Sequence, residues 1–290
     1  MSFQKRLISG EFVVLAEMDT PKGVDISELI TNARRIKGRV DAVIIPDMGD
    51  GMMRMSALGG GVLMHQQGVE AVIHVCCRDR NRIAMQAELL SAHVLGIENL
   101  VVVRGEDMAF GDHLDAKTVN DIDQLELLGA IQSLQKGVDM AGVELKGSPS
   151  FTVGCTIEPY ADDKVLDLEL ELARKKVEAG AQFVVSPPVF DIDRFDSFMD
   201  KAKGLGVPVI QTVFLLKSVG IARYMATTLP AYHITDELIN RIRKAQNREL
   251  ECVRIAGEMV ADLKGLAQGV QIVTLGWEYQ LPAILDAAGL

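Results

Sequence analysis

The stretch that decides the fold is Gly96-Ile97-Glu98-Asn99-Leu100-Val101-Val102-Val103-Arg104-Gly105. In it, a glycine of the kind that ends helices precedes a Val-rich apolar run, and polar residues follow the run directly. Runs of the same kind recur, and we expect strands at 11–16, 41–45, 70–76, 99–103, 151–155, 182–186, 207–213 and 270–275. Glycines precede four other runs, at Gly68, Gly180, Gly206 and Gly269. We expect each of these glycines to take the left-handed conformation at a helix C-terminus.

Segments with helical periodicity separate these runs, at 24–36, 81–95, 121–135, 163–179, 191–203 and 235–263. The last is too long for one barrel helix and is expected to form two helices, or one with an extra turn. Eight strands that alternate with helices predict an α/β fold, the (β/α)8 TIM barrel. No linker rich in Pro, Ser or Gly divides the chain, so residues 1–290 are predicted to form a single domain. The alternative is an open doubly wound sheet, but its glycine fingerprint after the first strand is missing.

Composition narrows the classes of function. The net charge of −10 argues against nucleic acid as a partner, because acidic surfaces repel phosphate backbones. No apolar stretch approaches the roughly 18 residues of a membrane span, and the N-terminus lacks a secretory signal, so we expect a cytoplasmic protein. The cysteines, Cys76, Cys77, Cys155 and Cys252, form no Cys-x-x-Cys pair. We therefore expect reduced, mostly buried thiols rather than a zinc or iron-sulfur site.

Glu17 lies near the end of the first apolar run, in Glu11-Phe12-Val13-Val14-Leu15-Ala16-Glu17-Met18-Asp19. If this run is a buried strand, desolvation favours the protonated carboxyl and raises its pKa toward the range of a general acid. The alternative is a carboxylate at a strand end that pairs with a nearby Lys or Arg. Structural carboxylates outnumber catalytic ones, so this stretch alone favours the ion pair.

In a barrel the chemistry gathers where strands end, and polar residues follow several of the predicted strands. Asp47, Asp50, Glu106 and Asp107 are candidates for a divalent cation, but their spacing matches no calcium loop, and we predict no metal site. Arg78, Arg80 and Arg82 alternate around Asp79, and they serve either a structural network or contact with a substrate or diphosphate. The sequence has no nucleophile elbow, no Walker loop and no Schiff-base lysine in an apolar strand.

Short motifs in a specific order run through nearly the whole chain. They are Ala16-Glu17 with Pro21-Lys22-Gly23, Met53-Arg54-Met55-Ser56, Cys77-Arg78-Asp79-Arg80-Asn81-Arg82, Gly111-Asp112-His113 with Asp115-Ala116-Lys117, Lys175-Lys176-Val177-Glu178-Ala179-Gly180-Ala181, Pro188-Val189-Phe190-Asp191 and Gly276-Trp277-Glu278. In this order of motifs the sequence resembles the flavin-dependent methylenetetrahydrofolate reductases, especially the short forms of anaerobes that use the reductive acetyl-CoA route.

The resemblance implies a barrel with a flavin, FAD or else FMN, across the carboxyl ends of its strands. It implies reduction of 5,10-methylenetetrahydrofolate to 5-methyltetrahydrofolate, or the reverse, with hydride from flavin N5 and Glu17 as the general acid. Protonation of N10 opens the five-membered ring of the folate, and a carboxyl kept protonated near neutrality suits that step. The flavin performs the redox chemistry.

The resemblance also assigns other residues. His74 matches a flavin-contacting histidine, Arg104-Gly105-Glu106 matches an Arg-Gly-Asp that touches the flavin, and Lys176 matches a basic residue at the phosphate or ribityl portion. Glu106 also faces the pterin and is one methylene longer than the Asp of the family. Pro187 stands where the family usually has a folate-binding Gln, so one polar contact to the pterin is lost.

The resemblance leaves the electron donor open between NAD(P)H and a partner subunit that carries iron-sulfur clusters, and it implies an oligomer. Two other functions are open. One is a barrel that acts as a non-catalytic or electron-relay subunit of a larger redox complex. The other is a cofactor-free, folate-binding methyltransferase barrel.

Overall fold

The barrel predicted from the sequence is confirmed by the computed structural model, which describes residues 2–160, 162–188 and 190–290. Val189, part of one motif quoted above, lies outside the described residues. Eight parallel strands close in chain order, and β1 pairs with β8, which rules out the open sheet. The strands are β1 Val13–Glu17, β2 Ala42–Ile45, β3 Ala71–Cys76, β4 Asn99–Val103, β5 Thr152–Thr156, β6 Phe183–Ser186, β7 Val209–Phe214 and β8 Gly269–Val273.

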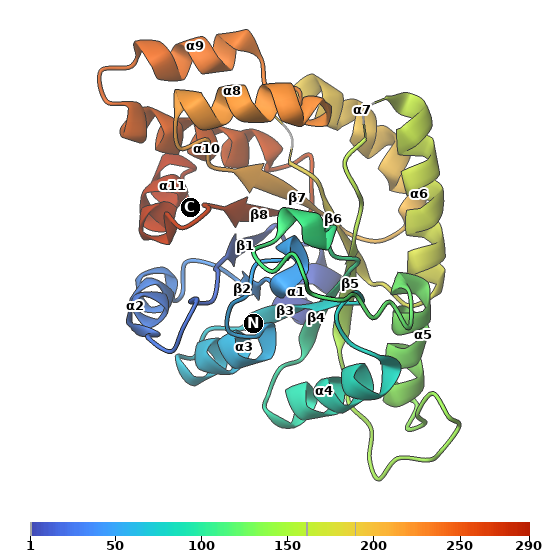
Figure 1. Cartoon of the computed structure of the whole chain (residues 1–290). Helices are drawn as coiled ribbons and strands as arrows, with labels where there is room; N and C mark the ends of the chain where they lie inside the picture. The colour runs from blue at the N-terminus through green and yellow to red at the C-terminus, as the bar shows by residue number, and fades with distance from the viewer. Residues whose placement is uncertain (1, 161, 189) are drawn as a thin grey trace.

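Helices form a ring around the strands (Figure 1). They are α1 Phe3–Ser9, α2 Ser27–Ile36, α3 Ala57–Gln66, α4 Arg82–Val94, α5 Gln124–Gln135, α6 Asp163–Glu178, α7 Ile192–Ala202, α8 Val219–Thr228, α9 Asp236–Lys244, α10 Arg248–Leu263 and α11 Leu281–Ala287. The segment 235–263 divides into α9 and α10, which begin at the N-caps Thr235 and Asn247. No helix in the described part of the chain is long and apolar enough to cross a membrane. All four cysteines are free and buried.

Helix α3 was not predicted from the sequence, because it contains Gly59, Gly60 and Gly61, which weaken a helix. Its glycines allow close packing on the barrel. A β-carbon on Gly60 would lie 2.8 Å from Ile45, and one on Gly61 would lie 2.7 Å from Ile73. Tertiary packing therefore overrides local propensity here. The short helices α1 and α11 and helix α8 were also absent from the predicted set.

The glycines ahead of the strands mostly behave as expected. Gly68, Gly96, Gly180 and Gly206 have positive φ values, as the prediction of left-handed helix ends requires. The prediction for Gly269 was wrong. Gly269 is the first residue of β8, where a β-carbon would lie 2.4 Å from Val13, so its small size serves the packing of β8 on β1. The left-handed glycine ahead of β8 is Gly265, with φ 107°.

The interior of the barrel has its own apolar cluster, closed at the N-terminal end of the strands by α1. Phe3 and Leu7 of α1 pack among the inward-facing residues, and the rings of Phe3 and Phe183 meet edge-on at 5.6 Å. Side chains alternate along a strand, so Glu17 follows the inward-facing Leu15 on the same face. A polar layer therefore covers the apolar interior at the carboxyl end of the strands.

Candidate functional site

A cavity of about 460 Å³ opens at the carboxyl ends of the strands. Its walls include the apolar side chains of Val103, Ile157, Val185, Phe214 and Val273. Six carboxylate residues also line it, namely Glu17, Asp19, Asp47, Asp50, Glu106 and Glu158. Of the residues proposed from sequence, the structure brings Glu17, His74, Arg104, Gly105, Glu106 and Pro187 together here.

Glu17 ends β1 and is only partly exposed to this cavity. Burial, followed by the negative charge of Asp19, raises the pKa of Glu17 to about 8, while a hydrogen bond from Gln271 opposes the shift. The Nε2 of Gln271 donates to Oε2 of Glu17 over 2.6 Å. Arg54 pairs instead with Asp19 and Asp50, so the ion-pair alternative for Glu17 is not what the structure contains. The carboxyl is thus mostly protonated at neutral pH and suits a proton donor.

His74 lies on β3 and faces the same cavity. Burial lowers its pKa to about 4. The imidazole is therefore neutral at physiological pH, so it can contact a ligand by packing or by a neutral hydrogen bond. It adds no positive charge to the cavity.

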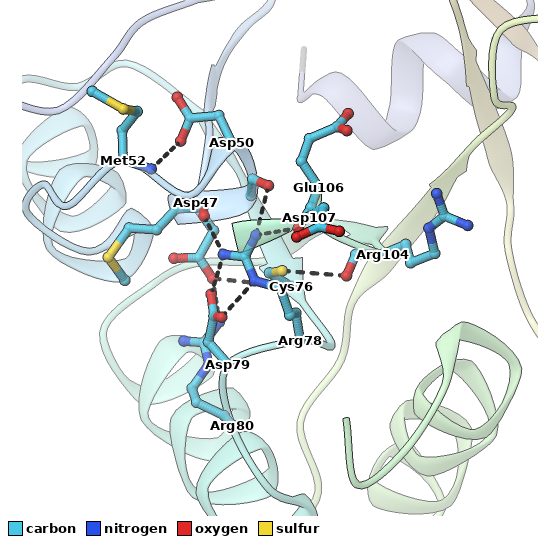
Figure 2. A network of polar contacts seen from close by, with 12 residues as sticks. Asp47, Asp50, Met52, Cys76, Arg78, Asp79, Arg80, Arg104, Glu106 and Asp107 are labelled. Carbon is cyan, nitrogen blue, oxygen red and sulfur yellow. Dashed lines mark hydrogen bonds and ion pairs between the residues drawn. The ribbon is translucent and has the colours of Figure 1, made fainter. Parts of the chain in front are cut away.

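The loops after β2 and β4 are held together by Arg78, which is 4 % exposed. Its guanidinium donates to the carbonyls of Met48 at 2.6 Å, Gly49 at 3.1 Å and Glu106 at 2.6 Å, and it pairs with Asp79 (Figure 2). Arg78 therefore fixes the backbone from which Glu106 extends.

The neighbouring arginines also have structural partners. Arg80 pairs with Asp47 and Glu88, and Arg82 pairs with Asp121. None of Arg78, Arg80 and Arg82 is among the described residues that line the cavity. Of the two alternatives for these arginines, the structural network is the one that the geometry supports.

Arg104 and Gly105 directly follow β4 and line the cavity. The side chain of Arg104 extends away from the Arg78 network (Figure 2), and it makes no hydrogen bond or ion pair with the described residues. Arg104 is the only Lys or Arg in the described lining of the cavity. Gly105 has φ 91°, and a β-carbon there would lie 2.7 Å from Sγ of Cys76, so only glycine fits this turn.

Lys176 is the one proposed residue that the structure does not bring to the cavity. It lies on α6, is 1 % exposed, and donates from Nζ to the carbonyl of Thr156 over 2.8 Å. Its role at a flavin phosphate stays a prediction that this geometry does not support. Pro187 lines the cavity, but its carbonyl already accepts a hydrogen bond from Gln211 at 2.5 Å.

Two buried acceptor atoms at the cavity have no donor among the described residues. They are Oδ1 of Asp47, a residue 3 % exposed, and Oε1 of Gln271, a residue 4 % exposed. An unpaired buried acceptor costs about 1–3 kcal/mol, so such atoms mark places where a ligand can donate a hydrogen bond. We missed Gln271 in the sequence, although a glutamine between Val270 and Ile272 in an apolar strand is the signal that would have found it.

No group of three or more His, Cys, Asp or Glu residues in the described ranges is placed to hold a metal ion. This covers the candidates Asp47, Asp50, Glu106 and Asp107. Asp47 is bound instead to Arg80, and the Asp107 side chain accepts from the backbone N–H of Ala109.

A comparison with known protein families shows to which family the chain belongs. The model of the methylenetetrahydrofolate reductase family matches residues 2–289. The chain belongs to the methylenetetrahydrofolate reductase family.

Curated relatives of this family member are distant. Methylenetetrahydrofolate reductase 2 of Schizosaccharomyces pombe is 22% identical over 79% of this chain and 37% of its own length. The probable methylenetetrahydrofolate reductase (NADPH) of Caenorhabditis elegans is 22% identical over 77% of this chain and 33% of its own. The chain thus spans about a third of the length of these relatives.

Among solved structures, EDTA monooxygenase (EmoA) from Chelativorans sp. BNC1 is similar, with a TM-score of 0.56 and 10% identity. The alignment covers 96% of this chain and 94% of that one. At this identity the likeness concerns the fold alone.

The cavity of this reductase-family chain fits a flavin. Its volume lies in the usual range for cofactor pockets, and its apolar walls suit a flat ring system. The unpaired acceptor Oδ1 of Asp47 complements the ring N–H of a flavin, and the side chain of Arg104, which has no partner among the described residues, is available to an anionic group. These residues, with His74 and Gly105, are the ones that would hold it.

Proposed function

We propose that this protein reduces 5,10-methylenetetrahydrofolate to 5-methyltetrahydrofolate, or catalyses the reverse reaction, with FAD or FMN as its cofactor. The observation that carries the proposal is the protonated carboxyl of Glu17, with its pKa of about 8, in the mouth of a barrel of this family. Burial without a cationic partner keeps the carboxyl of Glu17 neutral near pH 7, which is the state that a general acid requires.

Glu17 supplies the proton that the folate needs. Its carboxyl protonates N10, the bond from N10 to the bridging carbon breaks, and the carbon becomes an electrophilic iminium at N5. When bound, a flavin in its reduced form would supply the hydride that converts this carbon to a methyl group. One proton and one hydride together account for the product, and Glu17 is reprotonated from solvent.

Other residues place the reactants. Glu106 extends from the loop that Arg78 fixes and is the acceptor proposed for the N–H edge of the pterin. Arg104, Gly105 and His74 are proposed to contact the flavin. We propose a nicotinamide nucleotide or a partner protein as the electron donor.

The test starts from the purified protein under anaerobic conditions. 5-Methyltetrahydrofolate should bleach the absorbance of the bound flavin, and NADH can then be tried as the donor. Glu17→Gln should retain the flavin and lower folate turnover by about 10²–10⁴-fold, because proton transfer loses its acid. Glu70→Gln is the matched control, since Glu70 lies before β3 at the opposite end of the barrel and contacts Phe3 and Asn99.

Each negative result has its own meaning. Undiminished folate turnover in Glu17→Gln would refute the role of Glu17. A protein that binds flavin but neither oxidises nor reduces folates would instead be the electron-relay barrel, a function that the lost polar contact at Pro187 favours. A protein without flavin absorbance, and unable to regain it on addition of flavin, would refute the reductase.

A further inference from the structure

Gln271 and Glu17 lie side by side at the carboxyl end of the barrel interior. Strand β8 pairs with β1, with Gln271 opposite Leu15, so the two side chains extend from neighbouring strands toward the same cavity. The Nε2 of Gln271 is 2.6 Å from Oε2 of Glu17. Gln271 makes no other side-chain hydrogen bond with the described residues.

This contact distinguishes the two oxygens of Glu17. Oε2 accepts the amide N–H, whereas Oε1 accepts no hydrogen bond from the described residues and is not a buried atom. In a neutral carboxyl the carbonyl oxygen is a stronger acceptor than the hydroxyl oxygen, so an N–H donor binds preferentially to the carbonyl oxygen. The contact from Gln271 therefore favours the proton of Glu17 on Oε1, the oxygen that accepts no hydrogen bond from the described residues.

The surrounding charges keep that proton in place. Burial, Asp19 and Glu278 favour the neutral form, and Arg54 opposes it, as does the Gln271 hydrogen bond. These charged residues come from the loops after β1, β2 and β8. None of them donates a hydrogen bond to Glu17, so Gln271 alone among the described residues orients the carboxyl.

The orientation of the Gln271 side-chain amide decides whether it donates a hydrogen bond to Glu17 or accepts one from it. A side-chain amide turned by 180° would present Oε1 in place of Nε2 and accept the proton of Glu17, which would hold that proton away from a ligand. In the orientation observed, the amide N–H faces Glu17 and the amide oxygen has no donor.

We propose that Gln271 is a positioning residue that directs the acidic proton of Glu17 into the cavity by holding the opposite carboxyl oxygen. This inference rests on the proposed function, in which Glu17 is the general acid. It assigns a role in the reaction to a residue of β8 that does not itself exchange a proton with the folate.

Infrared difference spectroscopy tests the proposal without any turnover. The C=O band of protonated Glu17 is identified as the band that Glu17→Gln removes. In Gln271→Met, which keeps the length of the side chain but removes the donor, this band should move to higher wavenumber because its carbonyl oxygen loses a hydrogen bond. The pKa of Glu17, read from the same band, should rise further, because the lost N–H favoured the charged form.

The matched control is Gln211→Met. Gln211 is a glutamine of β7, 1 % exposed, that bonds to Pro187, Thr212 and Ser186 and not to Glu17. This variant should leave the Glu17 band where it is. A band unchanged in Gln271→Met, or shifted equally in Gln211→Met, would overturn the proposal.

Kinetics provide the second measurement. Gln271→Met should lower kcat by about tenfold or more with little change in KM, and should move the basic limb of the pH profile to higher pH. If no folate activity exists even in the unaltered protein, the proposed function fails, while the infrared shift still decides whether Gln271 orients Glu17.

Discussion

Glu17 should make the folded protein less stable as the pH rises. Its pKa is about 8 in the folded state against 4.5 for the free side chain, so between these values the folded state holds a proton that the unfolded state has lost. The free energy of unfolding therefore falls with pH across this window. The stabilising contribution of the proton is complete below pH 4.5, declines steadily between pH 4.5 and 8, and is gone above pH 8.

The size of this pH effect on the free energy of unfolding follows from the raised pKa of Glu17. One pKa unit corresponds to about 1.4 kcal/mol, so the linkage between pH 6 and pH 9 is at most about 2.7 kcal/mol. Glu17 is partly exposed to the cavity, and solvent screening reduces this, so we expect about 1–2 kcal/mol. Glu17→Gln removes the titrating group and with it this part of the pH dependence.

The assay is urea unfolding of the flavin-free protein and of Glu17→Gln at pH 6, 7, 8 and 9. All other groups contribute equally to the two proteins, so the difference between their free energies of unfolding isolates Glu17. That difference should move in favour of the variant as the pH rises. Two parallel curves would refute a raised pKa at Glu17 and remove the main support for the general acid.

Three further predictions concern the residues that shape the cavity. Gly111→Ala should lower stability by about 1–3 kcal/mol, because its β-carbon would lie 2.2 Å from the carbonyl oxygen of Gly51. Gly129→Ala is the control and should not lower stability, because the space around Gly129 is open. Thermal unfolding compares the two variants, and equal losses of stability would contradict the close contact at Gly111. Arg78→Lys should lower the free energy of unfolding by about 2–4 kcal/mol and expose the loop after β4 to limited proteolysis, because one ammonium cannot replace the guanidinium contacts. The surface variant Arg82→Lys is the control and should lower it by less than about 1 kcal/mol. An unchanged cleavage pattern in Arg78→Lys would show that Arg78 does not hold the loop. The imidazole of His74 should titrate in NMR spectra with a pKa of about 4. The unfolded chain binds this proton near pH 6.5, so the free energy of unfolding should fall as the pH drops from 6.5 toward 4, and His74→Gln should reduce that fall. A titration near pH 6.5 would show that His74 is exposed to water.

The positions of the strands could be read from the sequence because both faces of a parallel barrel strand are buried. Such strands appear as continuous Val- and Ile-rich runs, as in Leu100-Val101-Val102-Val103. Left-handed glycines at Gly68 and Gly96 were predictable for the same local reason, since the conformation follows from the residue type at a helix end. Gly269 was not, because its glycine is required by Val13 on a neighbouring strand, a contact that no local pattern reveals.

The candidate site likewise combines features that the sequence predicts with features that only the tertiary structure reveals. Its position at the strand ends and the choice of Glu17 followed from the order of strands and from the family resemblance. Lys176 shows the limit, because its motif matched while its side chain turned to the carbonyl of Thr156 between α6 and the barrel. Which face of a helix a side chain occupies depends on packing, and a short motif does not record it.

By itself, the sequence determined the (β/α)8 fold, the family and the residues that end each strand, because these depend on local patterns of apolar and polar residues. Only the tertiary structure decided that Glu17 is a protonated acid held by Gln271, a residue 254 positions away along the chain. A pKa depends on burial, on nearby charges and on hydrogen bonds in space. Closing the barrel brings β8 against β1, and that contact sets the environment of Glu17.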